Sequence, residues 1–141
     1  MKTVSAFTGL LAIGVTFVGN VAAQYECYNS GRTELTGHLI RHSQRACEGY
    51  DGIQGRFQGT FQPREFRSVC VNLPGGNRLN MEVQNLNTQR AFDLRDSDCT
   101  KEFHNIANEC NEYLFEYPHN QGGYATVAGW WFKIDPNSGR C

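Results

Sequence analysis

The chain has 141 residues, of which 13 are Lys or Arg and 14 are Asp or Glu, and its formal net charge is −1. Charges of both signs are mixed along the chain, and this balance argues against a protein that holds nucleic acid through an excess of positive charge. No P-loop, GxGxxG, HExxH, EF-hand or nucleophile-elbow pattern occurs. We therefore expect no nucleic-acid partner and no cofactor.

The first 23 residues have the pattern of a secretory signal peptide. Lys2 precedes an apolar run over residues 6–18, and Val21-Ala22-Ala23 places small residues where a signal peptidase cleaves. The apolar run is short for a membrane span, which needs roughly 20 residues. The sequence therefore predicts a signal peptide over residues 1–23 and one extracellular domain over residues 24–141, secreted and without membrane insertion.

The cysteines all follow the predicted signal peptide. An even number of cysteines in a small secreted domain indicates disulfides, here three. The spacings are wide and include no C-x-x-C pair, so a zinc site is disfavoured and we expect no bound metal. Many pairings are open, and we prefer Cys110 with Cys141, which would tie the C-terminus to the end of a helix. The six predicted disulfide cysteines are Cys27, Cys47, Cys70, Cys99, Cys110 and Cys141.

The sequence of the first half of the domain predicts a short strand over residues 25–28 and then a helix over residues 33–48. Apolar residues recur at helical spacing in that segment, and Ser30 or Thr33 could cap its start. Gly37 inside the helix costs about 1 kcal/mol relative to alanine. Alternation of apolar and polar residues then predicts three strands, over residues 56–61, 68–73 and 79–84. The turn Pro74-Gly75-Gly76-Asn77 joins the last two of them.

In the second half, the sequence predicts a helix that Asp96 or Ser97 caps and that runs to about Tyr113, with an apolar stripe that includes Cys99 and Phe103. A strand over residues 124–132 follows, and the chain closes on a turn over residues 135–139. The order is thus strand, helix, three strands, helix, strand. This order predicts an α+β fold, a single-domain disulfide-bonded α/β sandwich with an antiparallel-rich sheet.

A candidate glycan site follows from the polar sides of these strands. In the last strand we expect the bulkier alternate residues, from Tyr124 to Ile134 and including Trp130, to face the core, which leaves Trp131 on the opposite side. An indole stacks on the apolar face of a sugar ring, and planar polar side chains exchange paired hydrogen bonds with sugar hydroxyls. The alternative is that Trp131 packs under a loop and the polar residues only face water. The predicted glycan-binding residues are Trp131, Lys133, Arg56, Gln58, Asn80, Glu82 and Gln84.

Two other functions use residue types that the chain contains. A secreted ribonuclease needs a base, an acid and a phosphate clamp, but no spacing singles out such a group. A toxin or effector that acts through protein contacts needs no catalytic group at all. His38 and His42 have a spacing that can hold a metal, yet no third ligand is evident, so we interpret them as a solvated helix face. The ribonuclease candidates are His38, His42, His104, His119, Glu65, Glu82, Arg56 and Arg67.

The order of cysteines and the C-terminal sequence together resemble a known family. Cys27-Tyr28 comes early, Ala46-Cys47 ends the first helix, and the chain finishes with Gly129-Trp130-Trp131-Phe132 and then the residues from Asp135 to Cys141. This pattern resembles the small secreted fungal glycan-binding proteins typified by a lectin of the shaggy ink cap mushroom. The family tryptophan corresponds to Trp130, whereas Trp131 stands at a position that the motif leaves variable.

The resemblance covers the whole of residues 24–141, although its specific part is the C-terminal motif. It implies a single α/β sandwich domain that binds an extracellular glycan or glycoprotein without catalysis and that can associate as a homodimer. Our leading hypothesis is therefore a secreted lectin-like protein with an effector or defence role, and the alternatives are a ribonuclease-like hydrolase and a protein-binding effector.

Overall fold

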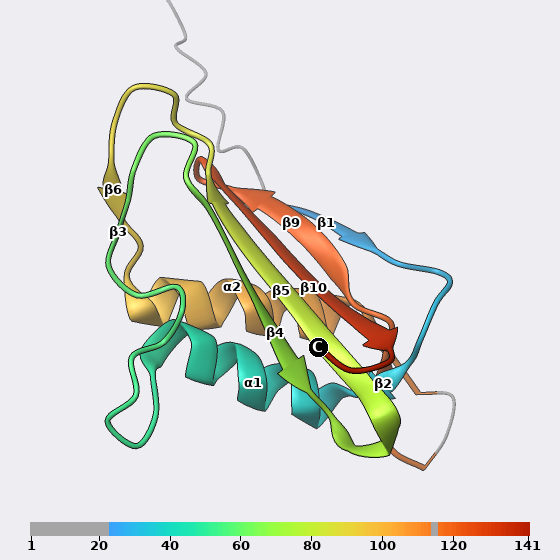
Figure 1. Ribbon diagram of the computed structural model, residues 1–141. Coiled ribbons are helices and arrows are strands. Elements are labelled where there is room, and N and C mark those ends of the chain that lie inside the picture. The colour runs from blue at the N-terminus through green and yellow to red at the C-terminus, as the bar shows by residue number, and fades with distance from the viewer. Residues whose placement is uncertain (1–22, 114–115) are drawn as a thin grey trace, which may run out of the picture.

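The computed structural model describes residues 23–113 and 116–141 (Figure 1). Residues 1–22, which hold almost all of the predicted signal peptide, lie outside the described residues. Within the described residues the chain forms two helices and antiparallel sheets, and three disulfides cross-link it. The predicted fold class, an α+β disulfide-bonded sandwich, is confirmed.

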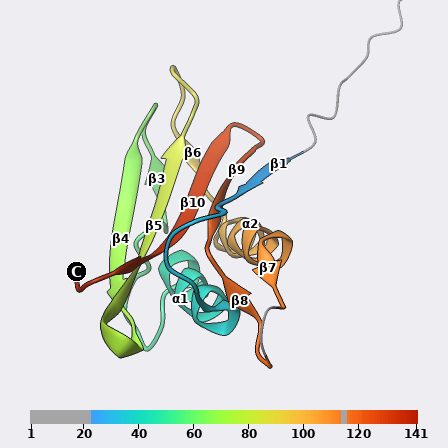
Figure 2. The same ribbon diagram turned by 90° about the vertical axis from the view of Figure 1, so that its right-hand side faces the viewer.

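The main sheet has five strands. Its order is β1 (Gln24–Cys27), β9 (Gly123–Val127), β10 (Trp130–Ser138), β5 (Asn77–Asn85) and β4 (Phe66–Asn72), and each neighbouring pair is antiparallel. The two longest strands, β5 and β10, lie in the middle of the sheet. Both helices cover one face of the sheet, and no helix of the described residues lies over the other face (Figure 2).

Short strands complete the fold at the ends of the helices. One small sheet joins β2 (Glu34–Leu35), β8 (His119–Asn120) and β7 (Asn111–Glu112), and another joins β3 (Thr60–Phe61) to β6 (Phe92–Asp93). The turn between β4 and β5 is the 3₁₀ segment η1 (Pro74–Gly76). The sequence predicted this turn but not the small sheets, because pairs of two residues are too short to show a periodic pattern.

Helix α1 spans Thr36–Glu48 and helix α2 spans Asp96–Glu109. Helix α1 starts later than predicted, and helix α2 ends earlier. Neither Ser30 nor Thr33 caps α1, because its N-cap is Leu35, whose N–H donates to the Glu34 carboxylate at 3.0 Å. Neither Asp96 nor Ser97 caps α2, because both lie inside the helix and its N-cap is Arg95. Helix α2 ends at Glu109 rather than near Tyr113, since the chain leaves the helix there to form β7.

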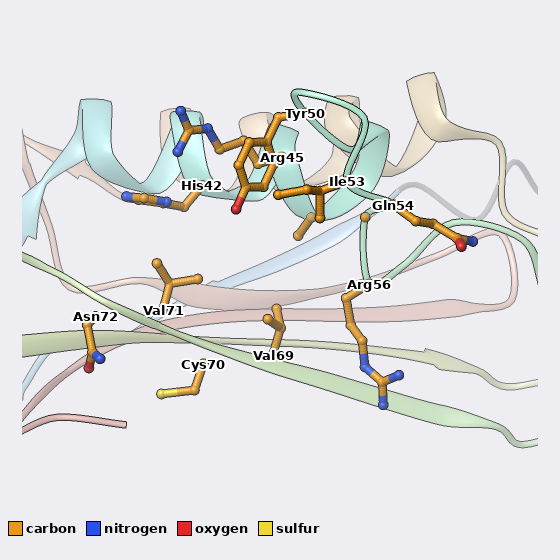
Figure 3. Close-up of a pocket in the computed structure, with 12 residues that line it drawn as sticks. His42, Arg45, Tyr50, Ile53, Gln54, Arg56, Val69, Cys70, Val71 and Asn72 are labelled. Atoms are coloured by element: carbon orange, nitrogen blue, oxygen red, sulfur yellow. The ribbon is translucent and has the colours of Figure 1, made fainter.

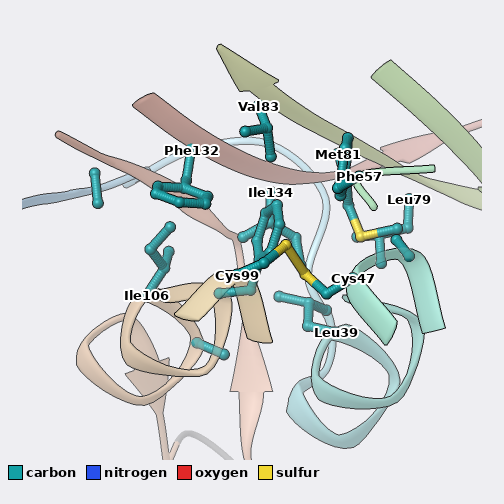
Figure 4. Close-up of a cluster of buried hydrophobic side chains, with 14 of the residues drawn as sticks. Leu39, Cys47, Phe57, Leu79, Met81, Val83, Cys99, Ile106, Phe132 and Ile134 are labelled. Carbon is teal, nitrogen blue, oxygen red and sulfur yellow. A yellow bond between two sulfur atoms is a disulfide. The ribbon is translucent and has the colours of Figure 1, made fainter. Parts of the chain in front are cut away.

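The core lies between the helices and the inner face of the sheet (Figure 4). Phe103 of α2 stacks on Phe57 with ring centroids 5.6 Å apart and meets Phe132 of β10 edge-on at 5.5 Å. Each fully buried large apolar side chain contributes about 1.5–3 kcal/mol. The core also contains Leu39, Leu79, Met81, Val83, Ile106 and Ile134.

All six cysteines lie in the described part of the chain and form the predicted number of disulfides, but not with the preferred pairing. The bonds are Cys27–Cys110, Cys47–Cys99 and Cys70–Cys141. The expected Cys110–Cys141 pair is wrong because the sheet separates these residues. Cys110 ends α2 on the helix side, whereas the C-terminal tail passes β4, where the Cys141 N–H donates to the Asn72 side chain at 2.8 Å.

The predicted last strand, residues 124–132, is in fact a hairpin. Strand β9 ends at Val127, Ala128 and Gly129 form the turn, and β10 begins at Trp130. Both turn residues have positive φ, 48° and 82°, as a two-residue hairpin turn of the primed type requires. The predicted turn over residues 135–139 is also wrong, since β10 continues to Ser138.

Pro136 is compatible with β10 because of where it lies. The pairing of β10 with β9 ends at Ile134↔Gly123, so beyond that point β10 pairs with β5 only. A proline is tolerated where one side of a strand has no partner, since no N–H is needed there. The sequence rule that Asp-Pro begins a turn therefore fails here for a tertiary reason.

Candidate functional site

The face of the main sheet that turns away from the helices is the candidate site, and we call it the open face. Alternation along each strand decides which side chains it displays. Strand β10 contributes Trp131, Lys133, Asp135 and Asn137, because the residues between them are buried in the core. The neighbouring strands add Arg78, Asn80, Glu82 and Gln84 from β5, Tyr124 and Thr126 from β9, and Phe66, Ser68, Cys70 and Asn72 from β4.

Four aromatic side chains form a row across the open face. Trp131 lies between Phe66 and Tyr124, with ring centroids 6.4 Å and 6.5 Å away, and Tyr124 lies 6.1 Å from Tyr28. We call these four residues the aromatic row. Phe66 is 48% exposed and Tyr124 is 36% exposed, while Trp131 is half-buried. Trp131 therefore lies on the open face between two aromatic rings and does not pack under a loop.

The hairpin turn explains why Tyr124 belongs to this row. An uninterrupted strand would place Tyr124 and Trp130 on the same side, as the sequence predicted. The two-residue turn instead pairs Trp130 with Val127 and Trp131 with Thr126, so Tyr124 and Thr126 share the open face with Trp131. The predicted orientation of Trp130 toward the core is correct, since its ring meets Phe61 edge-on at 5.1 Å.

Charged and amide groups lie beside the aromatic row. The ammonium nitrogen of Lys133 is 3.7 Å from a carboxylate oxygen of Glu82 and 3.8 Å from one of Asp135. These three side chains are each about a quarter exposed, so the ion pairs stabilise the fold little but hold the groups in place. The side-chain carbonyl of Asn80 accepts hydrogen bonds from the side chains of Arg78 at 3.1 Å and Asn137 at 3.0 Å.

Tyr28 at the end of the row has an altered ionisation. Burial raises the pKa of its hydroxyl to about 12, and the nearby carboxylates of Asp135 and Glu82 act in the same direction. The phenol therefore stays protonated at any physiological pH. It can donate a hydrogen bond to a ligand on the open face.

Five of the seven predicted glycan-binding residues meet on the open face: Trp131, Lys133, Asn80, Glu82 and Gln84. Gln84 lies in register between Phe66 and Trp131, which places an amide within the aromatic row. Lys133 lies in the next register position, opposite Glu82. The sequence-based grouping of these five residues is therefore reproduced by the geometry.

Arg56 and Gln58 do not lie on the open face, contrary to the prediction. The segment expected as a strand over residues 56–61 is a loop except at Thr60–Phe61, because the Phe57 N–H donates to the last turn of α1 at the carbonyl of Ala46. The Gln58 side chain donates to the Asp96 carboxylate at 2.7 Å. Arg56 instead donates through Nε to the Ser68 carbonyl at 3.0 Å, at the edge of β4.

Sequence reasoning missed Phe66, Tyr124, Tyr28 and Asp135 as members of the site. Phe66 follows the same alternation as Ser68, so extending the predicted strand by two residues would have found it. Tyr124 could be found only by recognising Ala128-Gly129 as a hairpin turn, and that dipeptide is a weaker turn signal than Asn-Gly. Tyr28 lies beyond the end of β1, so strand alternation does not predict its orientation.

The residues considered for a ribonuclease have separate partners. His38 lies 2.9 Å from the Glu34 carboxylate, and hydrogen bonds from the Leu35 N–H, Asn77 and His38 keep the pKa of Glu34 low although burial opposes this. His104 contacts the Ile40 carbonyl at 3.3 Å. Arg67 pairs with Glu65, a hydrogen bond that lowers the pKa of that carboxyl. His38, His104 and the Arg67–Glu65 pair thus each contact a different neighbour.

His42, which the sequence placed with His38 on a solvated helix face, lies on the side of α1 that faces β4. It is half-buried, and burial together with the neighbouring Arg45 lowers its pKa. Within residues 23–113 and 116–141, no group of three or more His, Cys, Asp or Glu side chains is placed to hold a metal ion. In the same part of the chain, neither helix is long and apolar enough to cross a membrane.

Comparisons with protein-family models, with curated proteins and with solved structures found no match to this chain. The fold and the site by themselves define a class: a small cysteine-rich, disulfide-bonded α+β protein with one uncovered sheet face. The aromatic row and the amides and charges beside it are the distinguishing features of that face.

Proposed function

We propose that this protein is a secreted lectin that binds an oligosaccharide on the open face, around Trp131, without catalysing a reaction. The observation that carries the proposal is the aromatic row with Gln84 in register between Phe66 and Trp131. Sugar rings have one apolar face and a rim of hydroxyls, so they fit an aromatic ring that has planar polar groups beside it.

The shape of the open face supports an extended ligand. Tyr28, Tyr124, Trp131 and Phe66 follow one another across the strands from β1 to β4. Successive rings in such a row can stack on successive sugar units, while Glu82, Lys133 and Asp135 offer hydrogen-bond acceptors and a donor beside them. We infer that the ligand is an oligosaccharide rather than a single sugar.

Secretion and the disulfides support the same function. Disulfides persist outside the reducing cytosol, where lectins meet the glycans of other cells or of the producer's own wall. The residues preceding Gln24 carry the signal-peptide pattern described above. The resemblance of the C-terminal motif to fungal glycan-binding proteins points in the same direction.

The test is a glycan-array screen of the oxidised protein beginning at Gln24, with two variants beside it. Trp131→Ala removes the centre of the aromatic row. Tyr113→Ala removes an aromatic side chain that is 80% exposed but does not belong to the row, and it serves as the matched control. We expect selective binding that Trp131→Ala loses and Tyr113→Ala keeps, with both variants folded by near-UV circular dichroism.

Two results would contradict the proposal in different ways. If the intact oxidised protein binds no glycan, the lectin function is wrong. If Trp131→Ala binds as well as the wild type, the function stands but the site on the open face is wrong.

A further inference from the structure

A concave surface lies away from the open face, between helix α1 and strand β4 (Figure 3). Its volume is about 470 Å³. Its walls include Val69 and Val71 of β4, Arg45 of α1, and Tyr50, Ile53 and Arg56 of the loop that follows α1. We call it the edge groove. None of the residues of the aromatic row lines it.

The groove exists because the sheet is wider than the helix layer. Strand β4 is the outermost strand, and it extends beyond α1 (Figure 2). Val69 and Val71 point toward the helix side, yet they are only half-buried. In Figure 3 both valines point into the groove toward α1, while Ile53 approaches from the opposite wall. The groove therefore has an apolar lining that the fold does not cover.

The edge of β4 beside this lining has no strand partner. Within the described residues β4 pairs with β5 only, through register positions from Phe66 to Asn72. The Ser68 carbonyl accepts a hydrogen bond from Arg56, so the peptide groups of Ser68 face away from β5. The backbone N–H and C=O groups of successive residues point to opposite edges of a strand, so residues two apart point to the same edge. The peptide groups of Cys70 and Asn72 therefore also face away from β5. Such an edge can accept a further strand.

The charge around the groove is positive. Arg45 lies over the Tyr50 ring, with its guanidinium carbon 4.5 Å from the ring centroid, and Arg56 lies at the other wall. No Asp or Glu is among the residues that line the groove. His42 also lines it, but its lowered pKa leaves it neutral at neutral pH. The cationic character of the groove therefore comes from the two arginines.

We propose that the edge groove binds an extended acidic peptide segment of a partner protein, which adds a strand beside β4. The peptide backbone pairs with Cys70 and Asn72. One face of the added strand is turned to the groove and carries both apolar side chains, which pack on Val69, Val71 and Ile53, and carboxylates, which pair with Arg45 and Arg56. A second copy of this chain is a poorer occupant, because pairing β4 with itself would bring two sets of these arginines together.

This site is independent of the glycan site. It uses the edge of the sheet and the helix side, whereas the aromatic row occupies the open face. A failure of glycan binding therefore leaves the peptide proposal standing, and the reverse holds as well. If both sites function, one molecule can bridge a glycan and a protein.

The test is a nuclear magnetic resonance titration of the ¹⁵N-labelled oxidised protein. The probe is a blocked peptide of about six residues, the usual length of a strand, in which valine and aspartate follow one another on one face and threonine occupies the positions between them. We expect shifts of the amide signals of Ser68, Cys70 and Asn72, and of the residues around Arg45. The comparison peptide has lysine in place of each aspartate and should not bind.

Two variants locate the charge effect. Arg45→Glu reverses a charge in the groove and should weaken binding of the acidic peptide by roughly tenfold or more. Arg41→Glu makes the same change at an exposed position of α1 that does not line the groove, and it should leave binding nearly unchanged. Trp131→Ala should also bind the peptide like the wild type. Thermal melting of each variant verifies that it folds.

Several outcomes would overturn the proposal. One is the absence of shifts along β4 at millimolar acidic peptide. A second is equal binding of the lysine peptide, which would show contacts without charge selection. A third is equal weakening by Arg41→Glu and Arg45→Glu, which would show a general charge effect instead of a site.

Discussion

Tyr124 and Trp131 lie side by side on the open face, with ring centroids 6.5 Å apart, although the alternation of a single strand would place them on opposite faces. The turn at Ala128 and Gly129 reverses the chain and brings Thr126 into register with Trp131. The stretch from Tyr124 to Trp131 thus contributes two neighbouring rings to one surface. The proposed glycan site depends on this relationship.

Tyr124→Ala should weaken glycan binding without unfolding the protein. Tyr124 is 36% exposed, so its ring is available to a ligand and its loss removes little core packing. We expect affinity to fall by roughly tenfold for the glycan that the wild type selects. Titration calorimetry with that glycan measures the change. Tyr124→Phe, which keeps the ring, should retain most of the affinity, and a loss equal to that of Tyr124→Ala would contradict stacking.

Two glycine substitutions should change stability in opposite directions. At Gly122, where φ is +80°, a Cβ would collide with the Ile134 carbonyl oxygen, so Gly122→Ala should lower the free energy of unfolding by at least about 2 kcal/mol. At Gly37, exposed in α1, nothing lies within 4 Å of the added Cβ. Gly37→Ala should therefore stabilise by about 0.5–1 kcal/mol. Urea unfolding of both variants measures these changes, and a stabilising Gly122→Ala would contradict the close backbone packing of β10 against this residue.

Tyr28 should ionise later than an ordinary tyrosine. Burial and the carboxylates of Asp135 and Glu82 raise its pKa to about 12, whereas in the unfolded chain the pKa lies near the ordinary tyrosine value of 10.0. The folded state therefore keeps this proton longer. Its contribution to stability is complete below pH 10 and is lost as the pH rises through 12.

The measurement is the absorbance of phenolate during an alkaline titration of the wild type and Tyr28→Phe. The difference between the two curves should show one group that titrates near pH 12. A difference curve centred near pH 10 would show that Tyr28 is not held in this environment.

Mild reduction should open Cys70–Cys141 before Cys47–Cys99. Both cysteines of the first pair are exposed, whereas Cys47 and Cys99 are completely buried in the core between the helices. Thiolate attack requires access to sulfur, so exposed disulfides react first. Alkylation followed by peptide mapping gives the order. Early opening of Cys47–Cys99 would contradict the buried position of this bond.

Complete reduction should cost several kcal/mol of stability, since the bonds join segments 52 to 83 residues apart in a small domain. The reduced, alkylated protein should therefore melt at a much lower temperature than the oxidised protein. Equal melting temperatures would contradict a stabilising role for the disulfides.

Local patterns were sufficient to predict much of the fold. Helical spacing located α1 and α2 to within a few residues, because each helix buries one stripe of its surface, as Cys99, Phe103 and Ile106 do in α2. Alternation located β4 and β5 and correctly oriented Trp130 and Trp131. The even number of cysteines correctly predicted three disulfides.

The sequence by itself therefore determined the class of fold, the faces of the long strands and the number of cross-links, since these depend on residues close in the chain. Only the tertiary structure decided which cysteines pair, that Tyr124 joins Trp131, and that Arg56 lies at the edge of β4. Each of these depends on distant segments or on the conformation of one turn. Alternation is a local property, but a hairpin reverses the chain, and the face on which a residue then lies depends on the turn's backbone angles.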